Sequence, residues 1–268
     1  MKLSRLTATV GAFVVGAVLA LTGAGAAHAT ENSAGPAYVA LGDSYSSGVG
    51  AGSYDSASGS CKRSTKAYPA LWAASHAPAS FNFTACSGAK TSDVLNNQLG
   101  PLGSGTGLVS ISIGGNDAGF ADIMTTCVLQ SESACVSAVN SAKTFVQNTL
   151  PGRLDQVYDA IRAKAPSAYV VVLGYPRFYK LSGTCVVGLS ETERAAINSG
   201  ADLLNSVTAK RAADHGFSFG DVATAFTGHE ICSGSAWLNS VTLPVDESYH
   251  PTAAGQSGGY LPVFSAAA

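Results

Sequence analysis

Charged side chains are scarce in this sequence. Of its 268 residues, 12% are Asp, Glu, Lys or Arg, and the 15 basic residues nearly balance the 17 acidic ones. No cluster of Lys and Arg occurs, and a nucleic-acid-binding surface needs one to neutralise phosphates, so we expect no nucleic-acid partner. Hydrophobic residues make up 46% of the chain, which excludes a disordered polar protein.

Several ligand-binding motifs are also missing. No pair of cysteines or histidines has the spacing of a zinc site. No glycine-rich motif of the nucleotide-binding type appears, because Gly48-Val49-Gly50 lacks the third glycine. The 30 glycines show no three-residue period, which excludes collagen. We therefore expect a protein that works without a metal ion or a cofactor.

One long apolar segment is present, and it lies at the N-terminus. Lys2 and Arg5 precede an apolar run over residues 6–21, and Ala27-His28-Ala29 has the small-x-small pattern of a cleavage site. This arrangement predicts a secretory signal peptide over residues 1–29. No later stretch is long enough to be a membrane helix, so we expect no transmembrane segment. Residues 30–268 are then expected to form a secreted, mildly acidic, monomeric protein with a single domain.

The cysteine count fits secretion. All six cysteines lie in the expected mature chain, and an oxidising compartment favours disulfides. Six cysteines allow fifteen pairings, among which short loops favour pairing in chain order. The cysteines are Cys61, Cys86, Cys127, Cys135, Cys185 and Cys232.

Apolar runs and helical patterns alternate along the chain. The predicted strands cover residues 38–41, 81–83, 108–113, 169–173 and 217–219. The predicted helices cover residues 68–76, 93–99, 136–164 with a break at Pro151, and 191–215, and residues 50–64 are expected to form a loop. The alternation predicts an α/β fold with a parallel sheet covered by helices on both faces. Ligands bind such sheets beyond the carboxyl ends of the strands.

Polar residues follow glycines at several of these predicted strand ends and in a C-terminal loop. They occur in Gly42-Asp43-Ser44, Cys86-Ser87-Gly88, Gly114-Gly115-Asn116-Asp117 and Tyr249-His250-Pro251. Each block alone is a common turn. Together they supply a serine nucleophile, backbone and side-chain N–H groups for an oxyanion, and a histidine base. The combination predicts an acyl-transfer site.

These blocks resemble those of the GDSL, or SGNH, hydrolases, and the resemblance covers residues 37–260. It implies a flavodoxin-like three-layer sandwich with a five-stranded parallel sheet. It also implies that Ser44 is the nucleophile and first oxyanion donor, that Gly88 and Asn116 complete the oxyanion hole, and that His250 is the base. The signal peptide and six cysteines are most similar to secreted actinobacterial lipases and phospholipases, whose cysteines pair in chain order. The implied disulfides are Cys61–Cys86, Cys127–Cys135 and Cys185–Cys232.

The sequence departs from that family pattern at two places. Tyr45 stands where the family usually has Leu. Three residues before His250, the family's Asp is replaced by Glu247, with Asp246 one residue further away. Either the Glu247 carboxylate or the Glu247 backbone carbonyl is therefore expected to accept the Nδ1 proton of His250, and we favour the carbonyl.

The sequence contains other serines and acids that could in principle serve the same chemistry. Ser218 and Ser257 both lie in G-x-S-x-G patterns, but Ser257 has no histidine after it, and Ser218 follows a long helix rather than a strand. A chymotrypsin-type order is excluded because no histidine precedes Ser44 in the expected mature chain. Asp43 and Asp117 are expected to bond local backbone N–H groups beside their glycines.

The sequence thus predicts a secreted serine ester hydrolase that acts on lipid esters, such as triacylglycerols or other fatty acyl esters, through a Ser-His acyl-enzyme mechanism. Phospholipase A1 and carbohydrate acetyl esterase activities are alternatives on the same site, and a non-enzymatic secreted binding module is a further one. The lipid prediction depends on apolar residues near the strand ends, namely Phe120, Tyr175, Phe178, Tyr179, Trp237 and Leu238.

Overall fold

The computed structural model describes residues 35–183, 185 and 188–268, and the expected signal peptide at residues 1–29 lies outside them. Five strands form one sheet in the order β2-β1-β3-β4-β5, and every neighbouring pair is parallel. The strands are β1 (Ala37–Gly42), β2 (Phe81–Phe83), β3 (Thr106–Ser112), β4 (Tyr169–Leu173) and β5 (Ser218–Gly220). This order is that of a flavodoxin-like fold, which confirms the predicted fold class.

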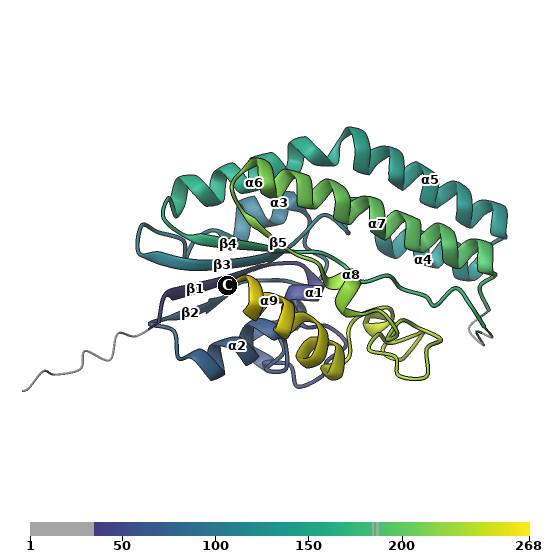
Figure 1. Cartoon of the computed structure of the whole chain (residues 1–268), viewed down its shortest axis with the longest axis horizontal. Helices are drawn as coiled ribbons and strands as arrows, with labels where there is room; N and C mark the ends of the chain where they lie inside the picture. Colours follow the sequence, from purple (N-terminus) through teal and green to yellow (C-terminus); the bar gives the residue numbers. More distant parts are fainter. Residues whose placement is uncertain (1–34, 184, 186–187) are drawn as a thin grey trace, which may run out of the picture. The chain divides into compact units, whose positions relative to one another are not determined.

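Helices cover both faces of the sheet (Figure 1). One face carries α3 (Thr91–Asp93), α4 (Phe120–Leu129), α5 (Glu132–Asn148), α6 (Leu150–Lys164) and α7 (Glu191–Asp214). The other carries α2 (Tyr68–His76) and α9 (Leu261–Ala267). The shorter elements are α1 (Ser44–Ser47), α8 (Val222–Ala225) and single turns at Ser56–Cys61, Val94–Gln98, Val245–Glu247 and Gly255–Tyr260. Crossovers on both faces explain why the strands are parallel.

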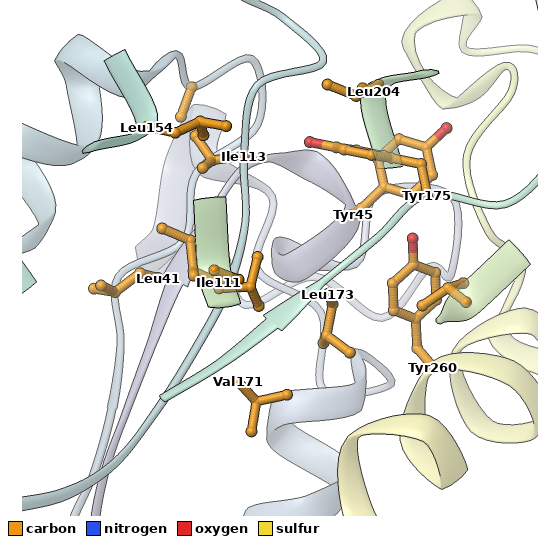
Figure 2. Packing of buried hydrophobic residues seen from close by; sticks show 14 of the residues in the cluster. Leu41, Tyr45, Ile111, Ile113, Leu154, Val171, Leu173, Tyr175, Leu204 and Tyr260 are labelled. Carbon is orange, nitrogen blue, oxygen red and sulfur yellow. The ribbon is translucent and has the colours of Figure 1, made fainter. Parts of the chain in front are cut away.

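The core lies along both faces of the central strands. Strand β4 is Tyr-Val-Val-Val-Leu, and its last four residues are buried, as expected for a strand covered on both sides. Side chains of β1, β3 and β4 pack with Leu154 of α6 and with Tyr260 (Figure 2). The aliphatic run of β4 thus specifies a buried central strand. Because β1, β3 and β4 are parallel, their carboxyl ends lie at the same edge of the sheet.

Most predicted elements are present near their predicted positions, but α4 and α9 were not predicted, nor were the four-residue helices α1 and α8. Helix α4 follows a Gly-rich stretch that reads as a loop, and α9 follows the glycine-rich Gly255–Tyr260 turn. Tyr260 and Phe264 are fully buried there. Their packing against the sheet outweighs the low helix propensity of the local sequence. Short-range composition therefore missed elements that tertiary contacts stabilise.

Three disulfides form in chain order, Cys61–Cys86, Cys127–Cys135 and Cys185–Cys232, which is the pairing that the resemblance implies. The first links the Ser56–Cys61 turn to the loop after β2. The second joins the end of α4 to the start of α5. Among the helices in the described part of the chain, none has both the length and the apolar character that crossing a membrane requires.

Candidate active site

The chain turns sharply between β1 and α1, and this turn presents Ser44. Gly42 has φ +123°, and a Cβ atom there would lie 2.5 Å from the Ser112 carbonyl oxygen, so only glycine fits. The Gln98 side-chain amide bonds both backbone polar groups of Gly42. Its Oε1 accepts from the Gly42 N–H at 2.7 Å, and its Nε2 donates to the Gly42 carbonyl at 2.8 Å. Ser44 is thereby fixed at the carboxyl edge of the sheet.

Asp43 is a buried carboxylate in the middle of this turn. It accepts hydrogen bonds from the Tyr45 N–H at 3.0 Å, from Ser112 Oγ at 2.7 Å and from the Tyr175 hydroxyl. Burial raises the pKa of Asp43 to about 6, although these hydrogen bonds counteract the shift. The prediction that Asp43 bonds only local backbone was therefore incomplete, because the residue also joins β3 and the loop after β4 to the nucleophile turn.

Ser44 and His250 form a hydrogen-bonded pair. Ser44 Oγ lies 2.7 Å from His250 Nε2, although the two residues are 206 positions apart in the chain. His250 Nδ1 lies 3.0 Å from the Ser248 carbonyl oxygen. A carbonyl can only accept, so the proton must be on Nδ1, and Nε2 is free to accept from the serine hydroxyl. This is the tautomer that a general base requires.

The acceptor for Nδ1 is the Ser248 carbonyl, which corrects the prediction for Glu247. The Glu247 carboxylate instead accepts from the Tyr54 hydroxyl at 2.8 Å, and the Glu247 carbonyl accepts from the His250 backbone N–H at 3.4 Å. Tyr249 has φ +64°, a left-handed conformation that turns the Ser248 carbonyl toward the imidazole. The Glu247 carboxylate is therefore engaged elsewhere, and the carbonyl that bonds Nδ1 is supplied one residue later.

The surroundings of His250 keep its ring neutral. Burial lowers the pKa of His250 to about 4, while the bond to the Ser248 carbonyl and the charge of Asp246 act in the opposite direction. Asp246 is paired with Lys62, whose charge also lowers the pKa. The Tyr45 ring lies 5.2 Å from the His250 ring, centroid to centroid, and its hydroxyl donates to the Tyr249 carbonyl at 2.7 Å. Tyr45 therefore contacts both the His250 ring and the backbone of the residue before it, and so helps to hold the loop that carries His250.

The two remaining predicted oxyanion donors come from neighbouring loops. The Cys86 N–H donates to the Gly42 carbonyl at 3.0 Å, so the loop that carries Gly88 lies against the end of β1. Asn116 Nδ2 donates to the Ala89 carbonyl at 3.0 Å. An amide nitrogen carries two hydrogens, so one N–H of Asn116 remains for an oxyanion. The structure thus brings the loops of Ser44, Gly88 and Asn116 together at the carboxyl edge.

Asp117 connects the same loops rather than bonding local backbone as expected. Its carboxylate accepts from the Thr91 N–H at 2.9 Å and from Thr91 Oγ1 at 2.6 Å, and Arg153 lies 3.2 Å away. The Asp117 side chain is fully buried, whereas Arg153 is half exposed. This contact ties the start of α3 to the loop after β3, and so stabilises the position of Asn116.

A narrow apolar slot opens beside Ser44. Its open volume is about 70 Å³. Three helices each turn one face toward it, with residues spaced as on the apolar stripe of a helix. These residues are Phe120, Ile123 and Met124 of α4, Val139, Ala142, Lys143 and Val146 of α5, and Ile197, Gly200, Ala201 and Leu204 of α7. The catalytic end of the slot is formed by Asp43, Ser44, Tyr45, Asn116 and Tyr175, and the Tyr45 and Tyr175 rings meet edge to face there (Figure 2).

The alternative nucleophiles lie elsewhere. Ser218 is the first residue of β5, so it lies at the amino edge of the parallel sheet, and its hydroxyl bonds the Tyr169 hydroxyl. Ser257 is exposed and bonds the Ala254 carbonyl at 3.4 Å. Neither serine has a histidine as its partner. Within residues 35–183, 185 and 188–268, no group of three His, Cys, Asp or Glu side chains could hold a metal ion.

Sequence reasoning missed several residues that hold the site. Gln98 and Tyr54 lie in segments without a recognisable motif, and Ser248 acts through its backbone carbonyl, so no sequence signal could have identified them. Tyr45 was noticed only as a departure from a family pattern, and Tyr175 only as an apolar residue. A hydroxyl-bearing aromatic directly after a strand-end glycine block is the one usable signal, since such a hydroxyl usually finds a hydrogen-bond partner when it is buried.

The chain is similar to several known proteins. The model of the GDSL-like lipase/acylhydrolase family matches residues 40–257. The chain is 68% identical over its full length to the full length of a lipase from Streptomyces rimosus. Two solved structures, each covered over its full length, are similar with a TM-score of 0.86. One is phospholipase A1 from Streptomyces albidoflavus, 73% identical over 88% of this chain, and the other is an extracellular lipase from Streptomyces rimosus, 72% identical over 87%.

Proposed function

The chain belongs to the GDSL-like lipase/acylhydrolase family and is a carboxylic ester hydrolase, and from this premise we propose that it cleaves lipid esters with Ser44 as the nucleophile and His250 as the base. The observation that carries the proposal is the 2.7 Å contact between Ser44 Oγ and His250 Nε2 at the mouth of an apolar slot. The neutral imidazole, with its proton on Nδ1, is ready to accept the serine proton.

In the first half of the reaction, Ser44 Oγ attacks the acyl carbonyl carbon while its proton moves to His250 Nε2. The carbonyl oxygen becomes an oxyanion, which accepts hydrogen bonds from the Ser44 and Gly88 N–H groups and from the Asn116 amide. The Ser248 carbonyl holds the imidazolium through Nδ1. The leaving alcohol then takes the proton from Nε2, and an ester of Ser44 with the acyl group remains.

In the second half, His250 removes a proton from water, and the resulting oxygen nucleophile attacks the acyl carbonyl of the Ser44 ester. The same donors stabilise the second oxyanion. The proton on Nε2 returns to Ser44 Oγ as the carboxylic acid leaves. No carboxylate touches the imidazole in this scheme, so the reaction proceeds with a Ser-His dyad and a backbone carbonyl.

The slot supports a fatty acyl substrate rather than an acetyl group. Its walls beyond the catalytic end are almost entirely apolar, and burying acyl methylenes there releases free energy of about 0.8 kcal/mol per CH₂. Two relatives also support a fatty acyl substrate, because they are named lipase and extracellular lipase. We therefore place the acyl chain between α4, α5 and α7, and the alcohol part on the solvent side of Ser44.

Phospholipase A1 activity is the second candidate. The observation that favours it is the 73% identity to a solved structure of phospholipase A1. The acyl slot serves a phospholipid and a triacylglycerol equally, because the two substrates differ in the alcohol part. The two activities are therefore compatible with one acyl site.

We also propose that the protein is secreted after removal of residues 1–29 and that the rest of the chain is one hydrolase domain. Three disulfides and the similarity to a relative named extracellular lipase support this location.

The test of substrate class is a series of p-nitrophenyl esters from acetate to palmitate, with phosphatidylcholine and a triacylglycerol assayed in parallel. We expect kcat/KM to rise from acetate to the longer chains. Release of fatty acid from the sn-1 position of phosphatidylcholine would establish the phospholipase activity. An optimum at acetate, with no release from either lipid, would contradict the lipid proposal.

A further inference from the structure

Helix α7 has a glycine in its interior, on the face that lines the slot. Gly200 lies in the middle of the 24-residue helix, with Ile197, Ala201 and Leu204 on the same face. Glycine is the poorest helix former apart from proline, so its presence here calls for a local reason. Helix α5 also contributes a small residue to the slot, since Ala142 lines it together with the larger Val139 and Val146.

Packing between the helices does not require this glycine. A Cβ atom at position 200 would lie 3.5 Å from Val139 Cγ1, an ordinary van der Waals contact, and no other atom outside the helix would lie within 4 Å. Alanine would therefore fit and would improve the helix. The missing side chain leaves its space to the slot, whose open volume of about 70 Å³ is small enough for a methyl group to matter.

The position along the slot is also informative. Leu204 lies at the catalytic end, since its Cδ1 is 3.6 Å from the Cβ position of Gly114, next to the Asn116 loop. Gly200 lies one helical turn further out, or about 6 Å along the helix. Its neighbour Ser199 accepts a hydrogen bond from the Lys143 ammonium at 3.3 Å, where both side chains are partly exposed. Gly200 therefore lies between the reacting carbonyl and the polar outer end of the slot.

We propose that Gly200 determines which acyl chains the enzyme accepts, by leaving room for the part of a fatty acyl chain that passes beyond the first turn of the slot. This inference rests on the proposed lipid function. A short acyl group ends near Ser44 and does not reach position 200. A long chain must pass it, so a side chain at this position acts on long substrates alone.

The experiment compares Gly200→Ala and Gly200→Leu with the parent enzyme on p-nitrophenyl acetate, butyrate, octanoate and palmitate. The ratio of kcat/KM for palmitate to that for acetate should decrease from Gly to Ala to Leu, with a loss of roughly tenfold or more for Leu, as expected when a hydrophobic pocket is filled. The kcat/KM for acetate should not change. Gly200→Ala should also unfold at the same temperature as the parent or a higher one, so that activity on long chains falls without a loss of stability.

Gly152→Ala is the matched control. Gly152 also lies in a helix, α6, and does not line the slot, and a Cβ atom there would have no neighbour within 4 Å. This variant should keep the parent chain-length profile. Ala142→Leu narrows the slot from α5 and should also reduce activity on long chains if Gly200→Leu fails to fold.

The outcomes separate this proposal from the proposed function. If the parent cleaves palmitate and the profiles of Gly200→Ala and of the folded leucine variants are unchanged, the role of Gly200 is refuted while the lipid function stands. If the parent cleaves acetate alone, the lipid function fails and the role of Gly200 fails with it. A graded loss restricted to long chains, absent from Gly152→Ala, supports the proposal.

Discussion

The proton on His250 is held by a backbone group rather than by a carboxylate. The Ser248 carbonyl is 3.0 Å from Nδ1, and the nearest acidic residue in sequence, Glu247, bonds Tyr54 instead. A backbone carbonyl fixes the tautomer as well as an acid does, but it adds only a dipole where an acid adds a charge.

Glu247→Ala should lower kcat by less than about tenfold, which corresponds to under ~1.4 kcal/mol of barrier. The substitution removes the bond to Tyr54 and leaves the Ser248 carbonyl in place. Replacing the acid of a charged triad, as in trypsin, costs roughly 10⁴ in kcat. Steady-state kinetics on a soluble ester give the answer, with circular dichroism to show that the variant is folded. A thousandfold loss in a folded variant would make Glu247 the triad acid.

The pH profile should show a base that stays neutral in mild acid. Burial lowers the pKa of His250 to about 4, and the base works only above its pKa. The kcat/KM should therefore hold from pH 8 down to about pH 5 and decline below that, whereas an ordinary histidine would already be half protonated near pH 6.5.

Asp43→Asn is the control for that profile, because burial raises the pKa of Asp43 to about 6. An acid limb near pH 6 that disappears in Asp43→Asn belongs to Asp43. A limb near pH 6.5 that persists in the variant would mean that His250 titrates normally, and the description of its surroundings would be wrong.

At the residue scale the sequence points to the proposed reacting residues better than to the groups that hold them. Ser44 and His250 were predictable because each stands in a motif beside a strand end or turn. The Ser248 carbonyl was not, because the choice between residues 247 and 248 depends on the left-handed conformation of Tyr249. Backbone carbonyls carry no residue identity, so a sequence pattern cannot single one out.

Among the elements, the loops after β1, β2 and β3 form one connected unit. The Cys86 N–H bonds the Gly42 carbonyl, and Asn116 bonds the Ala89 carbonyl. The Cys61–Cys86 disulfide holds the loop after β2, close to the end of that strand. Because the sheet order places β1 between β2 and β3, these loops meet where the strand order reverses, which is where ligands bind in such folds.

Asn116→Ala should lower kcat by roughly 10²–10³, the usual cost of losing one side-chain donor to an oxyanion. KM should change little, because the oxygen becomes charged only as the transition state forms. Measuring kcat and KM separately on one soluble ester tests this. A normal kcat would remove Asn116 from the oxyanion hole, and a change confined to KM would assign it to ground-state binding.

The strands and long helices were predictable, because burial on both faces gives an aliphatic run and burial on one face gives a helical stripe. Tyr169–Leu173 and Tyr68–His76 are the plainest cases. The slot was not predictable. Its walls come from three helices, one of which, α4, has no clear signal, and their approach depends on tertiary packing.

Across the whole described chain, the sheet gathers residues that are far apart in sequence. Ser44 lies near one end and His250 near the other, and the C-terminal segment returns to the carboxyl edge of the sheet before α9 packs on its face. Ser218 stands at the opposite edge of the same sheet. The fold thus separates Ser44 from Ser218, two of the three serines that lie in nucleophile-like motifs, and labelling can distinguish them.

Covalent labelling with a fluorophosphonate, followed by peptide mapping, tests the central claim most directly. The reagent forms a bond to a serine oxygen that a histidine base has activated and that faces oxyanion donors. We expect one label per chain, on Ser44, with labelling lost in Ser44→Ala and in His250→Ala and retained in Ser218→Ala. A label on Ser218, or full labelling of Ser44→Ala, would contradict the assignment of the nucleophile and with it the mechanism.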